Sequence, residues 1–251
     1  MTLPHRASSL PSLLLWTLSA AAIAAPSDKL TVSWREKPPA QYVENGVEKG
    51  FLLQRAKQVF AAAGIPVQFV MEPPKRIWVN LKANLPNYCS LGWYRLTERE
   101  QIAQYSHPLH TDPPHVILVA PGAVSQVARH ATLASLLSDQ SLVLGVVDSL
   151  SYGPELDAMI KRSTTQLATR TVAPTAMMRM VAAGRVSFMF LDREDYDYLI
   201  TREPSLKQSV RRELPDMPPG LPRHVVCSKA VPAATMDKLN AAIDASQKTH
   251  K

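Results

Sequence analysis

The sequence predicts an α/β protein with two Rossmann-like lobes joined by two crossover segments. Strand-like apolar runs and helix-like apolar periodicity alternate almost throughout the chain, a pattern typical of parallel-rich sheets covered by helices. The alternation forms two series, and a segment with four prolines at 215–222 precedes a final strand and helix. We therefore expect residues 25–120 and 221–251 to form lobe 1 and residues 121–220 to form lobe 2.

The first series starts with residues 30–34, an apolar run that predicts a strand ended by Pro38-Pro39. In residues 51–63 the apolar side chains recur at helical spacing, and Gly64 suits the position that closes a helix. The remaining elements expected in this series are a strand at 67–71, a helix after Pro73-Pro74, and strands at 88–91 and 115–120.

The second series repeats the alternation. Its expected helices are residues 133–137, a segment with Leu156, Met159 and Ile160, residues 175–183, and a segment directly after Asp192. Its expected strands are residues 142–147, 168–172 and 186–191. A strand at 225–227 and a last amphipathic helix complete the chain, and we expect both to return to lobe 1.

The first 24 residues have the pattern of a cleaved export signal. His5 and Arg6 precede an apolar stretch at 10–23 that is too short and too rich in alanine and serine to span a membrane. Ala22-Ile23-Ala24 fits the small-x-small rule for cleavage after Ala24. The expected location is therefore the periplasm, where an isolated cysteine pair can oxidise.

The formal net charge of +7 is spread along the chain without a dense run of lysine and arginine, which argues against nucleic acid as a partner. The hydrophobic fraction of 46% is sufficient for two lobes with their own cores. No Gly-x-Ser-x-Gly, His-Glu-x-x-His or phosphate-loop motif occurs, so neither an enzyme nor a cofactor is expected. His107, His110 and His115 are separated by prolines and match no compact zinc-ligand spacing, so no metal site is expected.

Cys89 and Cys227 are the only two cysteines, and each lies in an apolar strand-like run. If those strands are neighbours, a disulfide ties the last segment of the chain to its first half. The alternative is a pair of buried free thiols.

The stretch from Gly92 to Arg99 organises the functional interpretation. It follows the expected strand at 88–91 and reads as a turn leading into a short helix, because Thr97 and Glu100 have the spacing of a capping box. Arg99 then lies in the first turn of a helix just beyond a strand end, where α/β sheets hold small anions. A guanidinium there can grip a carboxylate through two parallel hydrogen bonds.

This stretch, followed by Tyr105-Ser106-His107-Pro108, resembles the Thr-x-x-Arg…Phe-Ser-x-Pro signature of periplasmic solute-binding protein family 3, the amino-acid-binding proteins of ABC importers. Similar matches occur in family order along essentially the whole chain after the signal. The matching segments are Pro38-Pro39, Gly46…Gly50-Phe51, Gly145-Val146…Ser151-Tyr152-Gly153 and Gly184-Arg185-Val186…Asp192.

The resemblance implies a type II periplasmic-binding-protein fold that closes on a ligand held between its lobes. It also implies roles for particular residues. Arg99 would bind a ligand carboxylate, Asp192 a ligand amine, and Ser151 would assist at the carboxylate. The aromatic residues that would cover the rest of the ligand are Trp34, Trp93 and Tyr94.

The chain departs from the family pattern around the signature. Leu96 replaces the threonine three residues before the arginine, and bulky Trp93 and Tyr94 lie beside an additional Arg95. A larger, more aromatic or more anionic ligand suits these residues better than a standard amino acid, and Arg95 joins the candidate ligand-binding residues. Two alternatives stay open: Arg99 as the partner of a neighbouring glutamate, and Asp192 as a helix N-cap.

The resulting functional hypothesis is a monomeric periplasmic protein that captures a small polar solute and presents it to a membrane importer or sensor. A protein of the same fold that senses or scaffolds without transport is the first alternative. A periplasmic enzyme on this fold is the second.

Overall fold

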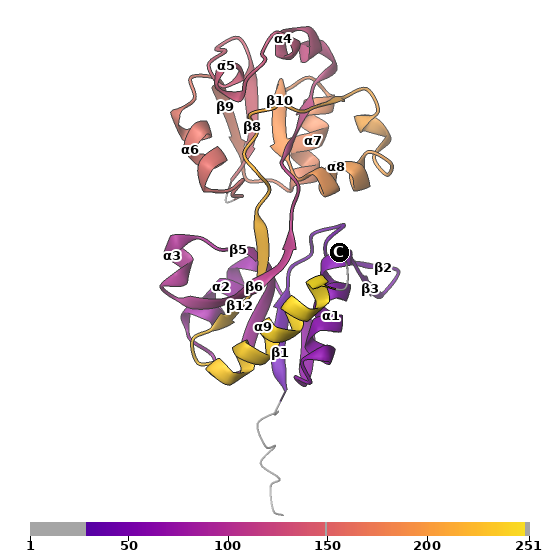
Figure 1. Ribbon diagram of the computed structural model, residues 1–251. Helices are drawn as coiled ribbons and strands as arrows, with labels where there is room; N and C mark the ends of the chain where they lie inside the picture. The colour runs from indigo at the N-terminus through magenta and orange to yellow at the C-terminus, as the bar shows by residue number, and fades with distance from the viewer. Residues whose placement is uncertain (1–28, 149, 249–251) are drawn as a thin grey trace, which may run out of the picture.

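The computed structural model describes residues 29–148 and 150–248, and within them the chain forms two lobes connected by two adjacent segments (Figure 1). The expected export signal lies outside the described residues. In the described part of the chain, no helix is both long and apolar enough to cross a membrane.

Lobe 1 is built on a five-stranded sheet in the order β4-β1-β5-β12-β6. Strands β4 and β5 run parallel to β1, whereas β12 is antiparallel to both β5 and β6. The strands are β1 (Leu30–Trp34), β4 (Val67–Met71), β5 (Tyr88–Tyr94), β6 (Ala103–Thr111) and β12 (Pro222–Ser228). A separate hairpin pairs β2 (Tyr42–Glu44) with β3 (Val47–Lys49).

Two hydrophobic clusters cover the two faces of this sheet. One cluster joins residues of β1 and β5 to α1 (Phe51–Ala62) and α9 (Ala233–Lys248), which lie side by side in Figure 1. The other packs α2 (Pro74–Lys82) against Tyr88, Trp93 and Val226. The one-turn helix α3 (Thr97–Glu100) follows β5. Helices on both faces explain why the central strands β1, β5 and β12 are buried on both sides.

Lobe 2 contains a second five-stranded sheet in the order β11-β7-β10-β8-β9. The strands are β7 (Val116–Val119), β8 (Val143–Val147), β9 (Gln166–Arg170), β10 (Phe188–Leu191) and β11 (Val210–Arg212). The helices are α4 (Val124–Ala128), α5 (Leu133–Leu136), α6 (Pro154–Arg162), α7 (Pro174–Ala182) and α8 (Arg193–Leu199), with short 3-10 turns at Pro121–Ala123 and Pro204–Leu206. One continuous apolar core runs through this lobe.

The two segments that connect the lobes are residues 112–115 and 213–221. The expected boundary at residue 120 is displaced, because β7 pairs with β10 and β11 in the second sheet. The connections touch each other: Asp112 N–H donates to the Leu221 carbonyl at 3.0 Å. A Cβ placed on Gly220 would lie 1.5 Å from the Asp112 carbonyl oxygen, so only glycine allows this approach.

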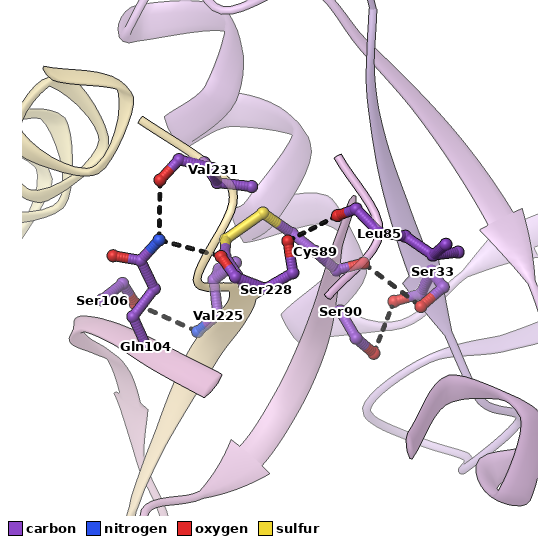
Figure 2. The surroundings of a disulfide bond; sticks show 10 residues. Ser33, Leu85, Cys89, Ser90, Gln104, Ser106, Val225, Ser228 and Val231 are labelled. Atoms are coloured by element: carbon purple, nitrogen blue, oxygen red, sulfur yellow. Dashed lines mark hydrogen bonds between the residues drawn. A yellow bond between two sulfur atoms is a disulfide. The ribbon is translucent and has the colours of Figure 1, made fainter. Parts of the chain in front are cut away.

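The disulfide between Cys89 and Cys227 is present, with the two sulfur atoms 2.00 Å apart. The two residues face each other directly in the pairing of β5 with β12 (Figure 2). Around the bridge, Gln104 donates to the Ser228 and Val231 carbonyls at 2.9 and 2.8 Å. The returning segment is thus fixed to the first half of the chain by covalent and hydrogen bonds, as the strand-neighbour prediction requires.

Most predicted elements are present, and the described residues also form elements that were not predicted: the β2–β3 hairpin, β6, α4 and β11. The expected turn at Gly92 is absent, because β5 continues through Trp93 to Tyr94. Gly92 has a φ of 80°, and the pairing register shifts next to it, between His224 and Val225. Helix α3 does begin at Thr97, but no side chain caps it. The strand expected at 168–172 is β9 at Gln166–Arg170.

Candidate ligand-binding site

A cavity of about 440 Å³ lies between the lobes, a size typical of small-molecule sites. It is lined from lobe 1 by residues at the carboxyl ends of β1 and β5 and from lobe 2 by residues at the carboxyl ends of β8 and β10. Crevices at the carboxyl ends of strands are where open α/β sheets bind ligands.

Two guanidinium groups stack around Trp93 in this cavity. The Arg35 guanidinium lies 4.2 Å from the centre of the Trp93 ring, and that of Arg99 lies 5.6 Å from it. Arg99 also stacks on Trp78 at 4.6 Å, and the two indoles meet edge to face at 4.9 Å. The Trp93 ring is itself fixed, because its Nε1 donates to Ser90 Oγ at 2.8 Å.

Neither guanidinium pairs with a carboxylate among the described residues. Arg35 Nη1 donates only to the Gly92 carbonyl, at 3.3 Å. Burial lowers the pKa of Arg35 to about 10, and the positive charge of Arg223 acts in the same direction. Burial also lowers the pKa of Arg99. An anion bound here would compensate two charges that the protein leaves without an acidic partner.

The carboxylates that lobe 2 contributes to the cavity, Asp192 and Asp195, are already paired with cations of the protein. Lys37 Nζ, from lobe 1, lies 2.8 Å from Asp192 Oδ2 and 2.7 Å from Asp195 Oδ1 in lobe 2. Arg223 Nη2 lies 2.9 Å from Asp192 Oδ2, and His115 Nε2 lies 3.1 Å from Asp192 Oδ1. Burial alone would raise the pKa of Asp192, but the charges of Lys37 and Arg223 hold it well below its usual range.

Arg223 is fixed in place by the hinge. Its Nε donates to Asp112 Oδ1 at 2.8 Å, and its Nη2 donates to the Tyr94 hydroxyl at 2.8 Å. The Tyr94 hydroxyl in turn donates to Asp112 Oδ2 at 2.6 Å. Arg223 is only 4% exposed and Asp112 also 4%. We call Lys37, Asp112, Asp192, Asp195 and Arg223 the interlobe ion cluster, because its pairs join lobe 1, the hinge and lobe 2.

The turn before α6 also has its polar groups satisfied. Ser151 Oγ donates to Asp157 Oδ2 at 2.6 Å, and the Tyr152 N–H donates to Asp157 Oδ1 at 2.9 Å. Ser151 Oγ also accepts from the Gly153 N–H at 3.1 Å. Ser151 lines the cavity, but the Asp157 carboxylate already occupies the donors of this turn.

The structure brings five of the seven predicted ligand-binding residues to the cavity: Trp93, Tyr94, Arg99, Ser151 and Asp192. Asp192 precedes α8 without capping it. Trp34 is 0% exposed in the lobe 1 core and does not line the cavity, because its position in β1 turns it toward α1. Arg95 lines a second depression of about 410 Å³ and pairs with Glu100.

The three histidines considered for a metal site bind different acids. His107 contacts Asp244 on α9, and His115 contacts Asp192. His110 lies with Asp112 and Glu194, three side chains whose ligand atoms fall within 4.8 Å of one another. Because Asp112 already accepts from Arg223 and Tyr94, we interpret the His110–Glu194 contact of 3.2 Å as an interlobe bridge.

Three residues of the site carry no motif and were not predicted: Arg35, Lys37 and Arg223. Arg35 and Lys37 follow the carboxyl end of β1. Open α/β sheets bind ligands at such ends, so this position could have indicated both residues from the sequence. Arg223 had no local signal, because its role depends on β12 returning beside β5.

No protein-family model matches the chain, and no curated protein matches its sequence. Its fold is nevertheless similar to solved structures. ArtJ, an arginine-, lysine- and histidine-binding protein from the thermophilic bacterium Geobacillus stearothermophilus, is 16% identical with a TM-score of 0.67 over 88% of this chain and 90% of ArtJ. A histidine kinase sensor domain with similarity to periplasmic binding proteins is 17% identical with a TM-score of 0.68 over 88% of this chain and 91% of the domain.

A third similar structure is AncCDT-1, an ancestral amino-acid-binding protein and a precursor of cyclohexadienyl dehydratase. It is 17% identical with a TM-score of 0.67 over 89% of this chain and 91% of its own. At such identities the likeness establishes the fold. The two-lobed type II fold of periplasmic binding proteins, predicted from the sequence, is confirmed.

Proposed function

We propose that this protein binds a small organic solute in the cavity between its lobes. The observation that carries the proposal is the pair of guanidiniums, Arg35 and Arg99, stacked on Trp93 at the wall of that cavity without an acidic partner among the described residues. Charges withdrawn from solvent are normally paired, so two half-buried guanidiniums that line a cavity without an ion pair point to an anionic ligand. The similar solved structures include two amino-acid-binding proteins, ArtJ and AncCDT-1, which supports the same general role.

A thermal-shift screen tests this function. The protein without residues 1–24 is heated with amino acids, dipeptides, polyamines and aromatic acids. A ligand at 100 times its Kd stabilises the folded state by about 2.7 kcal/mol, which for a protein of this size raises Tm by roughly 5 to 10 °C.

The matched variants are Arg99→Gln in the cavity and Arg129→Gln on the exposed surface of lobe 2. The proposal expects the shift to be lost in Arg99→Gln and kept in Arg129→Gln. A broad panel that produces no shift would reject solute binding.

Delivery to a membrane importer is the proposed use of the bound solute. A sensory role is the second candidate, because the chain shares its fold with a histidine kinase sensor domain. Cells with and without the protein distinguish the two. Transport predicts that uptake of the labelled solute falls when the protein is absent, whereas sensing predicts unchanged uptake and a lost transcriptional response to the solute.

The proposed function is binding of the solute without its chemical conversion. Two of the acids that line the cavity, Asp192 and Asp195, are both held by Lys37, so neither is positioned as an unengaged proton acceptor, and the other two, Glu36 and Asp148, are exposed to solvent. Incubation of the bound compound with excess protein, followed by NMR of the recovered compound, checks this directly. Recovery of a changed compound would favour a catalytic role.

A further inference from the structure

Among the described residues that line the cavity, the charged groups without an ion pair are two exposed acids, Glu36 and Asp148, and two half-buried guanidiniums on lobe 1. Arg35 and Arg99 lie against Trp93 on lobe 1, and no ion pair compensates either guanidinium in the described parts of the chain. Burial is the main cause of the lowered pKa of Arg35, and the nearby charges of Asp192 and Asp195 offset it only in part. A ligand carboxylate, sulfonate or phosphonate placed here gains two charge-assisted contacts.

The two acids of the interlobe ion cluster that line the cavity, Asp192 and Asp195, offer no equivalent place for a ligand cation. Asp192 accepts from Arg223 and contacts Lys37, while both oxygens of Asp195 accept from Lys37 at 2.7 Å. Arg223 cannot move away, because Asp112 and Tyr94 hold it at 4% exposure. A ligand ammonium would have to displace Lys37 and would still meet the positive charge of Arg223.

The remainder of the cavity wall is largely apolar. Val147, Leu150 and Val172 from lobe 2 face the same cavity as Trp93. Its volume of about 440 Å³ accommodates a compact organic body beside the anionic group. The donors of the turn at Ser151 are taken by Asp157, so the guanidiniums of lobe 1 are the anion-binding groups that remain.

We propose that the cavity selects organic anions that carry no ammonium group, gripped by Arg35 and Arg99 with an apolar body against Trp93. Arg35 is therefore a second anion-binding residue beside Arg99, and Lys37 acts as an internal cation that fills the place a ligand amine would take. This inference rests on the proposed solute-binding function and narrows its ligand class.

Calorimetric titration with matched pairs tests the selectivity. Each pair differs by one amino group: phenylalanine and 3-phenylpropionate, leucine and 4-methylpentanoate, glutamate and glutarate. In every pair with measurable binding, we expect the acid without the amino group to bind at least tenfold more tightly. Tighter binding of the amino acid would overturn the inference while leaving solute binding intact. No binding by any member would instead overturn the proposed function.

Three variants test whether Arg35 binds the anionic group of the ligand. Arg35→Gln should weaken binding of the preferred acid at least tenfold, Arg35→Lys should weaken it less, and Arg129→Gln should leave it unchanged. Far-UV circular dichroism confirms that each variant is folded. An undiminished affinity in folded Arg35→Gln would overturn the assignment of Arg35.

Lys37→Met provides a gain-of-function test. Removing the internal ammonium frees carboxylate oxygens of Asp192 and Asp195. The ratio of the affinity for the acid to the affinity for the matching amino acid should therefore fall at least threefold. An unchanged ratio between the two members of each pair would contradict the role of Lys37.

Discussion

Removal of the Cys89–Cys227 disulfide should destabilise lobe 1 while leaving lobe 2 largely unaffected. The bridge joins residues separated by 138 positions in the chain. In the chain-entropy model, a closed loop of this length reduces the entropy of the unfolded state by an amount worth roughly 5 kcal/mol at 25 °C. Because β12 carries Arg223 only four residues before Cys227, the same bridge holds part of the interlobe ion cluster in register.

The perturbation is the double substitution Cys89→Ala with Cys227→Ala, which leaves no lone thiol. Urea unfolding is followed by tryptophan fluorescence in protein without residues 1–24, which also removes Trp16. The remaining tryptophans, Trp34, Trp78 and Trp93, all lie in lobe 1, so the signal reports that lobe alone. This choice matters because a two-lobed protein need not unfold in one step.

The expected loss in the free energy of unfolding of lobe 1 is between about 2 and 5 kcal/mol, since residual structure in the unfolded chain reduces the entropic effect. A reducing agent should lower the stability of the wild type similarly and leave the double variant unchanged. A loss below about 1 kcal/mol in lobe 1 would refute the reasoning. So would an equal loss across the whole transition followed by circular dichroism, which reports the helices and strands of both lobes.

Three further predictions concern the hinge and the ion cluster. Asp112→Asn removes one of the two carboxylate partners of buried Arg223, while Asp192 remains, and should cost about 3 kcal/mol in urea unfolding; a loss under about 1 kcal/mol would contradict the assigned contacts. Gly220→Ala forces the two hinge segments apart and should lower Tm by several degrees, whereas Gly122→Ala, with no atom within 4 Å of the added Cβ, should not; equal effects would contradict the close approach. Burial raises the pKa of Asp195 from 3.8 to about 6, so its contribution to stability is present at low pH and is lost as pH rises through about 6. The Tm of wild type minus that of Asp195→Asn should therefore fall between pH 5 and pH 7, and a rise across this range would contradict that sign.

Local sequence patterns predicted most of the secondary structure because apolar periodicity and glycine or proline breaks act over short distances. The strand at 67–71 and the helix after Pro73 appear at the expected positions as β4 and α2. The end of β5 was misjudged for a physical reason. Gly92 suggested a turn, but it forms an irregular point in a strand that continues because β12 pairs with it from the far end of the sequence.

The candidate site was only partly predictable. Arg99 and Trp93 belong to one continuous motif, so a single stretch indicated both. The state of Asp192 could not be read from its neighbours, because its cations come from Lys37 in lobe 1 and Arg223 in β12. Ser151 illustrates the same limit at short range, since Asp157 six residues later takes its hydroxyl through the geometry of the turn.

The crystal structure of the complex with the compound that raises Tm most is the most direct test of the central claim. We expect the compound in the cavity between the lobes, with its anionic group within hydrogen-bond distance of Arg35 and Arg99 and its apolar part on Trp93. Asp192 should keep its contacts to Lys37 and Arg223. A compound bound instead in the depression beside Arg95, or one whose cationic group replaces Lys37 at Asp192, would contradict the account.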